Sequence, residues 1–214
     1  EALAQAQATL TKLGKKVSAA VGSELLDASG VIEGSSSLRA AVADAVVPSE
    51  SKQKLMAKVF AAAGEPTRAI LDEVAAQRWS HPDDVVAAIV NLGIRAEAIV
   101  SGSGLDEELL AIGEVIGSDP ELELTLGSKL GDSEAKAALV RNLFAKKASA
   151  PAVRIVEHLV RHARGRRIGA MLTEAAKVVA DQYGFDLATI TVATELKKQA
   201  ASRLEKTLTT SYGR

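Results

Sequence analysis

The 214-residue sequence contains no cysteine, and aromatic residues make up only 3% of it. Without cysteine, disulfides, thiolate metal sites and a cysteine nucleophile are all excluded. Cores built from β-sheets use more aromatic residues, so their scarcity argues against a β-rich fold. Hydrophobic residues nevertheless make up 47% of the chain, with alanine, leucine and valine dominant. This composition is typical of helices that pack through small and branched side chains.

Positive and negative residues nearly balance, because the formal net charge is −1 although 25% of the residues are charged. No global field therefore recruits nucleic acid or an anionic membrane. No apolar run approaches the roughly 20 residues that span a bilayer, and no signal peptide is visible. The chain begins with Glu1 rather than methionine, which leaves open a targeting or membrane segment upstream.

Recognisable catalytic motifs are missing as well. The glycines of segment 127–131 lack the spacing of a phosphate-binding loop, so nucleotide binding is not expected. His158 and His162 have the spacing of two metal ligands on one helix, but arginines flank them and the acid of a zinc-protease motif is absent. We interpret the histidines as part of a solvated helix face, with a metal-dependent enzyme as the alternative. No catalytic residue, metal or cofactor is expected.

The only concentrated basic patch consists of Arg161, Arg164, Arg166 and Arg167, around Gly165. One interpretation is a site for phosphate or an acidic partner, because guanidinium groups bind both in a fork geometry. The interpretation that we favour is a helix C-terminus, a glycine stop and the start of another helix, since basic residues complement the helix dipole there.

The strongest positive feature is an internal repeat. The segment that begins at Glu24-Leu25-Leu26 recurs from Glu108-Leu109-Leu110, and the offset of 84 residues persists without a gap to Phe60 and Phe144. Turn residues and apolar positions therefore stay in phase across several helices. A period of this length is above that of ordinary solenoid repeats and predicts two copies of one multi-helix bundle.

Prolines and capping residues divide the chain into amphipathic segments. Helices are expected at about 1–20, 22–33, 36–45, 49–62, 66–78, 82–101, 105–117, 120–129, 133–146, 150–163, 166–183 and 195–211. The repeat offset maps segment 82–101 onto both the first helix and the helix near 166–183. One helix is therefore expected to close the first bundle and open the second, which predicts an all-α fold of two tandem bundles that share a helix.

The pattern changes after residue 184. Segment 187–193 is rich in β-branched residues and roughly alternating, which predicts a strand. A single strand has no sheet partner in this chain, so we interpret 185–214 as the beginning of an incomplete α/β domain. The predicted domains are accordingly 1–81, 82–184 and 185–214, with helix 82–101 shared between the first two.

Two of the expected helices carry apolar surfaces wider than a simple surface helix needs. In segment 82–101 one apolar stripe runs from Val85, while Val90 and Ile94 lie well outside it. The apolar residues of segment 150–163 cover an arc of about 160°, against about 100° for a helix with one buried side. Either a helix shared by two bundles buries both sides, or the surfaces form a groove for an amphipathic helix of another protein.

Several motifs then carry a resemblance to a known family. They are Leu105–Leu110, Ser118–Leu122, Ser133–Phe144, Arg164–Arg167 and the terminal Tyr212-Gly213-Arg214. In order and spacing they resemble the delta subunit of the bacterial F-type ATP synthase, the counterpart of the mitochondrial oligomycin-sensitivity-conferring protein. Residues 82–214 would correspond to its six-helix N-terminal domain and the opening of its C-terminal domain. The preceding bundle resembles an inserted copy in a long bacterial form.

The resemblance implies a mechanical function without catalysis. Such a peripheral-stalk, or stator, subunit links the catalytic head to the b-type stalk during proton-driven ATP synthesis, at the cytoplasmic face of the bacterial plasma membrane. In the family, the first and fifth helices of the six-helix domain bind an N-terminal helix of an alpha subunit. By position these are 82–101 and 150–163. The groove residues expected on this basis are Val86, Val90, Ile94, Val153, Val156 and Val160.

The sequence also departs from the family pattern. The family's C-terminal domain continues beyond the Tyr-Gly-Arg stretch and joins the b-type subunit, so that contact cannot be assigned to residues of this chain. In some bacteria the long form is fused downstream of a membrane-anchored b-type segment, and a chain that begins at Glu1 is compatible with such a fusion. The alternative function is a helical adaptor that binds amphipathic helices of other partners through the same grooves.

Overall fold

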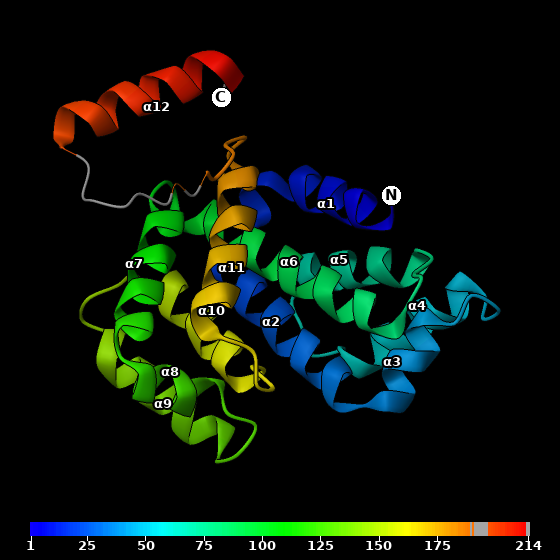
Figure 1. Ribbon diagram of the computed structural model, residues 1–214. Helices are drawn as coiled ribbons and strands as arrows, with labels where there is room; N and C mark the ends of the chain where they lie inside the picture. Colours follow the sequence, from blue (N-terminus) through cyan, green and yellow to red (C-terminus); the bar gives the residue numbers. More distant parts are fainter. Residues whose placement is uncertain (189, 191–196, 213–214) are drawn as a thin grey trace.

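A computed structural model describes residues 1–188, 190 and 197–212 of the chain (Figure 1). Over these residues the secondary structure is helical and no strand occurs, which confirms the all-α prediction. The helices are α1 (Ala2–Leu13), a 3-10 turn (Gly14–Lys16), α2 (Ala19–Gly34), α3 (Ser36–Ala43), α4 (Ser49–Val59), α5 (Glu65–Ala76), α6 (Pro82–Ser101), α7 (Leu105–Ser118), α8 (Pro120–Gly127), α9 (Ser133–Phe144), α10 (Ala150–Arg161), α11 (Ile168–Gln182) and α12 (Lys198–Tyr212).

The expected helix at 1–20 is wrong in its extent. Helix α1 ends at Leu13, and Gly14 follows with a φ of 49°, a conformation that glycine adopts without the penalty that other residues incur. A 3-10 turn then leads to Ser18, whose extended backbone sets the start of α2 at Ala19. The other helix bounds agree with the sequence-based ranges to within a few residues.

The helix bounds follow the sequence repeat. Helix α3 begins at Ser36 and α8 at Pro120, and both are eight residues long. Glu24 accepts hydrogen bonds from the Gly64 N–H and the Thr67 hydroxyl, while its repeat counterpart Glu108 accepts from the Ser149 N–H and hydroxyl. In both copies this carboxylate reaches the start of the fifth helix. The correspondence supports the repeat, whereas the domain boundaries at 82 and 185 stay predictions.

Two hydrophobic cores meet at α6. A first core is built mainly by α1, α2, α3 and α5, with Met56 from α4, and a second core by α7, α9, α10 and α11. Helix α6 contributes Val85, Ile89 and Leu92 to the first core, while Ile94 joins the second. Figure 1 shows α6 running between these two groups of helices. The second apolar side of α6 is therefore accounted for in part by burial, since Ile94 packs in the second core.

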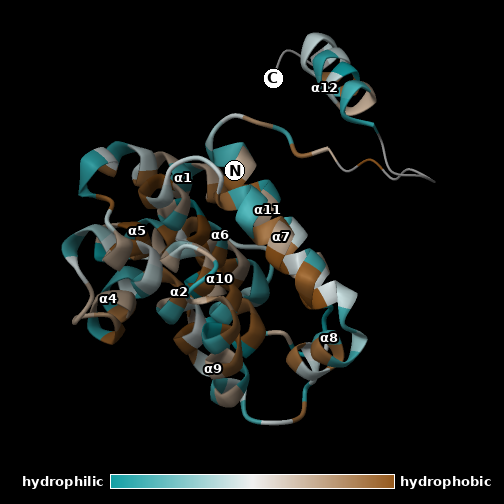
Figure 2. Ribbon diagram, turned by 90° about the vertical axis from the view of Figure 1, so that its left-hand side faces the viewer, coloured by the Kyte–Doolittle hydropathy of each residue, from teal (hydrophilic) through white to brown (hydrophobic). Residues whose placement is uncertain are grey.

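Helix α2 also connects the two cores. It packs along α6 in the antiparallel sense, because Gly22 lies beside Glu97 and Leu26 beside Gly93. A Cβ atom placed on Gly93 would lie 2.9 Å from Leu26 Cδ2, so glycine permits a close approach of the two helices. Leu26 belongs to the second core although α2 otherwise serves the first. Hydrophobic residues accordingly concentrate around α2 and α10 in the middle of the molecule (Figure 2).

The C-terminal part contains α12, which agrees with the helix expected at about 195–211. Of the predicted strand 187–193, the structure describes Leu187, Ala188 and Ile190 without assigning them to a strand, and the other positions lie outside the described residues. The incomplete α/β domain therefore stays a prediction. Within the described ranges, no single helix is both long enough and apolar enough to cross a membrane. Helices α6 and α7 meet these two criteria only when taken together, and the pair is bent by 115°.

Candidate functional site

A groove with a volume of about 830 Å³ lies among α6, α10 and α11. It has an apolar floor and a polar rim. Its lining comprises Glu33, Asp83, Val86, Ala87, Val90, Asn91, Ile94, His158, Leu159, His162, Arg164, Arg166, Arg167, Ala170, Met171, Glu174, Ala175 and Val178. A groove with these dimensions and this lining is suited to a side of an amphipathic helix.

The groove lies between the N-terminal parts of α6 and α11, because the C-terminal ends of these helices are joined. Arg95 on α6 forms an ion pair with Asp181 and donates a hydrogen bond of 3.2 Å to the Gln182 side chain. The Tyr183 hydroxyl donates to the carbonyl oxygen of Ala98. These bonds fix the two walls relative to each other and close the groove at that end.

The structure brings together half of the predicted groove residues. Val86, Val90 and Ile94 line the α6 wall of the groove. The three predicted valines of α10 instead point into the second core: Val153 is 7% exposed, Val156 0% and Val160 2%. They do not line this groove. The assignment of these six residues to partner binding stays a prediction.

Sequence reasoning did not identify the opposite wall, which belongs to α11. Met171, Ala175 and Val178 line it at spacings of four and three residues, the pattern of one helix face. Helix α10 reaches the groove through Leu159 and His158 rather than through its valines. The spacing of the apolar residues in α11 could have predicted this wall from the sequence. The orientation of α10 could not be predicted, because a wide apolar arc does not show which of its residues face the core.

The interpretation of the two histidines as a solvated face is wrong for His158, whereas His162 is partly exposed. His158 is only 7% exposed, and its Nε2 lies 3.3 Å from the hydroxyl oxygen of Ser29 on α2. Since the Ser29 hydroxyl donates to the Leu26 carbonyl, His158 Nε2 is the donor to Ser29. Burial, together with the neighbouring His162, lowers the pKa of His158 to about 3. His158 is therefore neutral near pH 7.

His162 and Glu33 form the second contact between α10 and α2. The Nδ1 atom of His162 is paired with the Glu33 carboxylate, and Arg164 Nε lies 3.2 Å from the same carboxylate. Burial alone would raise the pKa of Glu33, but the hydrogen bond and charge of His162, with Arg164, hold it below its usual value. Among the residues that the structure covers, no group of three or more acids and histidines has the arrangement of a metal site.

The basic patch divides into residues with different surroundings. Arg161 forms ion pairs with Glu134 at 2.7 Å and with Glu157 at 3.4 Å. Arg166 donates to the carbonyl oxygens at the end of α10, at 3.0 and 3.2 Å. This contact agrees with the helix-end interpretation, although α10 already ends at Arg161, and Gly165, with a φ of 88°, lies in the turn that leads to α11. Arg164, Arg166 and Arg167 nevertheless line the groove as well.

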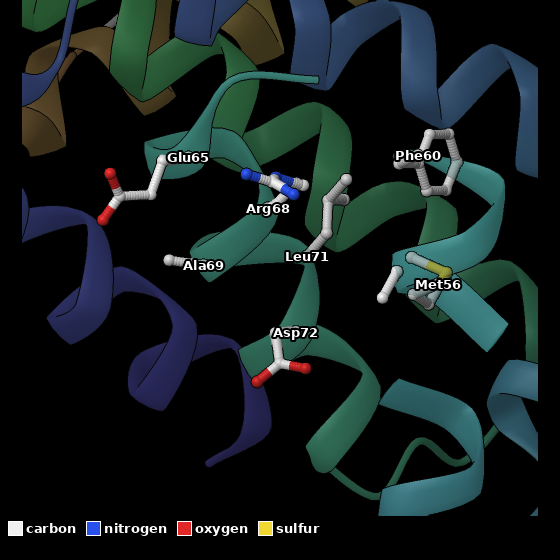
Figure 3. Close-up of a pocket in the computed structure, with 8 residues that line it drawn as sticks. Met56, Phe60, Glu65, Arg68, Ala69, Leu71 and Asp72 are labelled. Carbon is white, nitrogen blue, oxygen red and sulfur yellow. The ribbon is translucent and has the colours of Figure 1, made fainter. Parts of the chain in front are cut away.

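A smaller cavity of about 290 Å³ lies between α4 and α5, away from every residue predicted to bind a partner (Figure 3). Met56, Phe60 and Leu71 form its apolar part, and Arg68 and Asp72 its polar part. The repeat offset relates the last two to positions on α10 that are buried in the second core. The two copies therefore differ on this surface.

Comparison with known proteins gives a consistent result. The family model for the ATP synthase delta (OSCP) subunit matches residues 87–214. The chain is similar to the ATP synthase subunit delta of Leifsonia xyli, with 41% identity over all of this chain and 82% of the relative. It is also similar to the ATP synthase subunit delta of Streptomyces griseus, with 32% identity over 100% of this chain and 82% of the relative. The similarity to the ATP synthase subunit delta of Nocardia farcinica is 32% identity over 92% of this chain and 76% of the relative.

Proposed function

This chain belongs to the ATP synthase delta (OSCP) subunit family, and from that membership we propose that it is a non-catalytic peripheral-stalk subunit of an F-type ATP synthase. In this function it links the catalytic head to the b-type stalk and resists rotor torque during proton-driven ATP synthesis. It acts at the cytoplasmic face of the plasma membrane as a peripheral part of the complex. The observation that carries the proposal is the apolar groove beside α6, most of whose lining residues lie within 87–214, the part of the chain that matches the family model.

The partner proposed for this groove is an N-terminal helix of an alpha subunit. The apolar wall from Val86 to Ile94 spans about 12 Å, or roughly two helical turns, at 1.5 Å per residue. Val90 and Val178 are only partly buried and remain available for contact. Residues spaced by three or four positions on an amphipathic helix can bury their apolar side chains between the two walls.

The interlocked helices support a role in transmitting force. Glu97 on α6 is fully buried and accepts two hydrogen bonds, of 2.8 and 2.7 Å, from Arg154 on α10. Helix α2 also packs against both helices, with Gly22 beside Glu97 of α6 and Ser29 beside His158 of α10. A linker that resists torque requires parts that do not rotate against one another, and a helix shared by two cores provides this. The contact with the b-type subunit is not assigned to residues of this chain.

Co-purification with the head is the direct test. We expect the chain, mixed with an alpha/beta hexamer, to elute with it in size-exclusion chromatography, and to bind a synthetic peptide of the alpha-subunit N-terminus in titration calorimetry. Failure to elute with the hexamer would contradict the proposed function. If unrelated amphipathic helices bind equally well and the hexamer does not, the helical adaptor is the better description.

A further inference from the structure

One end of the groove is lined by arginines. Arg164, Arg166 and Arg167 follow α10 and precede α11, and all three are exposed where they line the groove. This is the end at which α6 and α11 begin, because their C-terminal ends are joined to each other. The apolar floor therefore runs from a closed end to a strongly basic open end.

The acids at this end already have partners. Glu33 is paired with His162 and with Arg164. Asp83 lies 3.4 Å from Arg39. Along the α11 wall, Glu174 forms an ion pair of 2.7 Å with Lys177. These three carboxylates therefore do not neutralise Arg166 and Arg167 at this end of the groove, which we call the arginine end.

Two arginines remain without a neutralising carboxylate. The side chain of Arg166 donates only to backbone carbonyl oxygens, which leaves its charge uncompensated. In the described part of the chain, the Arg167 side chain has no hydrogen bond or ion pair. The nearby Glu123 accepts the backbone N–H groups of Ile168 and Gly169, at 2.5 and 3.3 Å, rather than a guanidinium. Guanidinium groups of this kind favour carboxylates, which they bind in a bidentate geometry.

We propose that the arginine end selects the charge pattern of the helix that occupies the groove. The helix presents its apolar side to the walls of α6 and α11, and one or two carboxylates at one of its ends pair with Arg167 and Arg166. The proposal rests on the proposed function, in which the groove takes a partner helix. A small free anion would make no use of the apolar floor beside the arginines, so an acidic-ended amphipathic helix fits the whole surface better.

Arg167 is the residue to test, because its side chain has no bond within the described chain whose loss would disturb the fold. Three synthetic peptides would share one apolar face and carry two glutamates in the first turn, two in the last turn, or glutamines at both places. We expect one of the acidic peptides to bind the full chain more tightly than the glutamine peptide. Arg167→Glu should weaken that peptide about three- to tenfold and leave the glutamine peptide unchanged. Added salt should reduce the preference.

Two matched variants serve as controls. Arg167→Lys keeps the charge and should retain most of the preference, whereas Lys146→Glu makes the same charge change at an exposed position after α9 and should have no effect. Equal affinity of all three peptides, or an unchanged preference in Arg167→Glu, would overturn the inference while the groove itself still binds helices. If none of the peptides binds, the groove proposal fails and this inference with it.

Discussion

Glu97 and Arg154 form a two-bond contact between α6 and α10, and the glutamate is fully buried while the arginine side chain is 31% exposed. Helix α2 packs directly on this glutamate, since a Cβ atom at Gly22 would lie 2.6 Å from Glu97 Cδ. The ion pair therefore lies where three helices meet. Its integrity should determine how firmly the two cores are held together.

Replacing Arg154 by methionine should destabilise the chain by about 3 kcal/mol, because the buried Glu97 charge loses its partner. Urea unfolding followed by circular dichroism measures this loss. The double variant Glu97→Gln with Arg154→Met should recover a large part of it, since no buried charge is left unpaired. Equal stability of the single variant and the unchanged chain would contradict the role of the pair.

Gly93→Ala should destabilise the chain by about 1–3 kcal/mol, although alanine favours helices, because the new Cβ atom meets Leu26 at 2.9 Å. The matched control is Gly117→Ala in α7, where no heavy atom lies within 4 Å of the new Cβ. That substitution should stabilise by about 0.5–1 kcal/mol through helix propensity alone. Chemical denaturation of the two variants side by side measures the difference. A stabilised Gly93→Ala variant would show that α2 and α6 can move apart at no cost.

The neutral His158 predicts a loss of stability on acidification. Its pKa is about 3 in the folded chain and near 6.5 when exposed, so the unfolded chain binds the extra proton between these values. The contribution is complete above pH 6.5 and is lost as the pH falls toward 3, at up to about 1.4 kcal/mol per pH unit. His158→Gln, which can keep a donor for Ser29, should show a shallower decline between pH 6.5 and 5 in denaturant titrations. Parallel declines in both proteins would contradict the burial of a neutral imidazole.

Val90 and Val156 should respond differently to a negative charge. Val90→Asp is expected to weaken binding of the alpha-subunit peptide at least tenfold, with little change in melting temperature, because Val90 is partly exposed on the groove wall. Val156→Asp should instead unfold the second core, since its side chain is 0% exposed.

The control for the groove is Val100→Asp, on the same helix at a position that is 40% exposed and does not line the groove. It should leave peptide affinity unchanged in calorimetry. If Val100→Asp and Val90→Asp weaken binding equally, the effect is one of overall charge rather than of the groove.

Helix α6 shows which part of this arrangement could be predicted from the sequence. Helical periodicity fixed the angle between Val85 and Val90, so the second apolar side of the helix could be predicted before the structure was known. The orientation of α10 could not, because its broad apolar arc contains both core residues and a groove residue, Leu159. The burial of His158 was beyond local reasoning too, since its partner Ser29 lies 129 residues away. The arginines could be identified from the sequence as a basic patch, but their position at one end of a groove could not, because it depends on α6, α10 and α11 coming together.

The shared helix has a consequence for how such a chain can lengthen. In the predicted division, α6 is the sixth helix of one copy and the first of the next, so an added copy would require five new helices rather than six, which corresponds to the 84-residue offset between Glu24 and Glu108. Each added copy would be joined to its neighbour by a continuous helix, with no flexible linker between them. The chain would therefore lengthen in fixed steps of 84 residues.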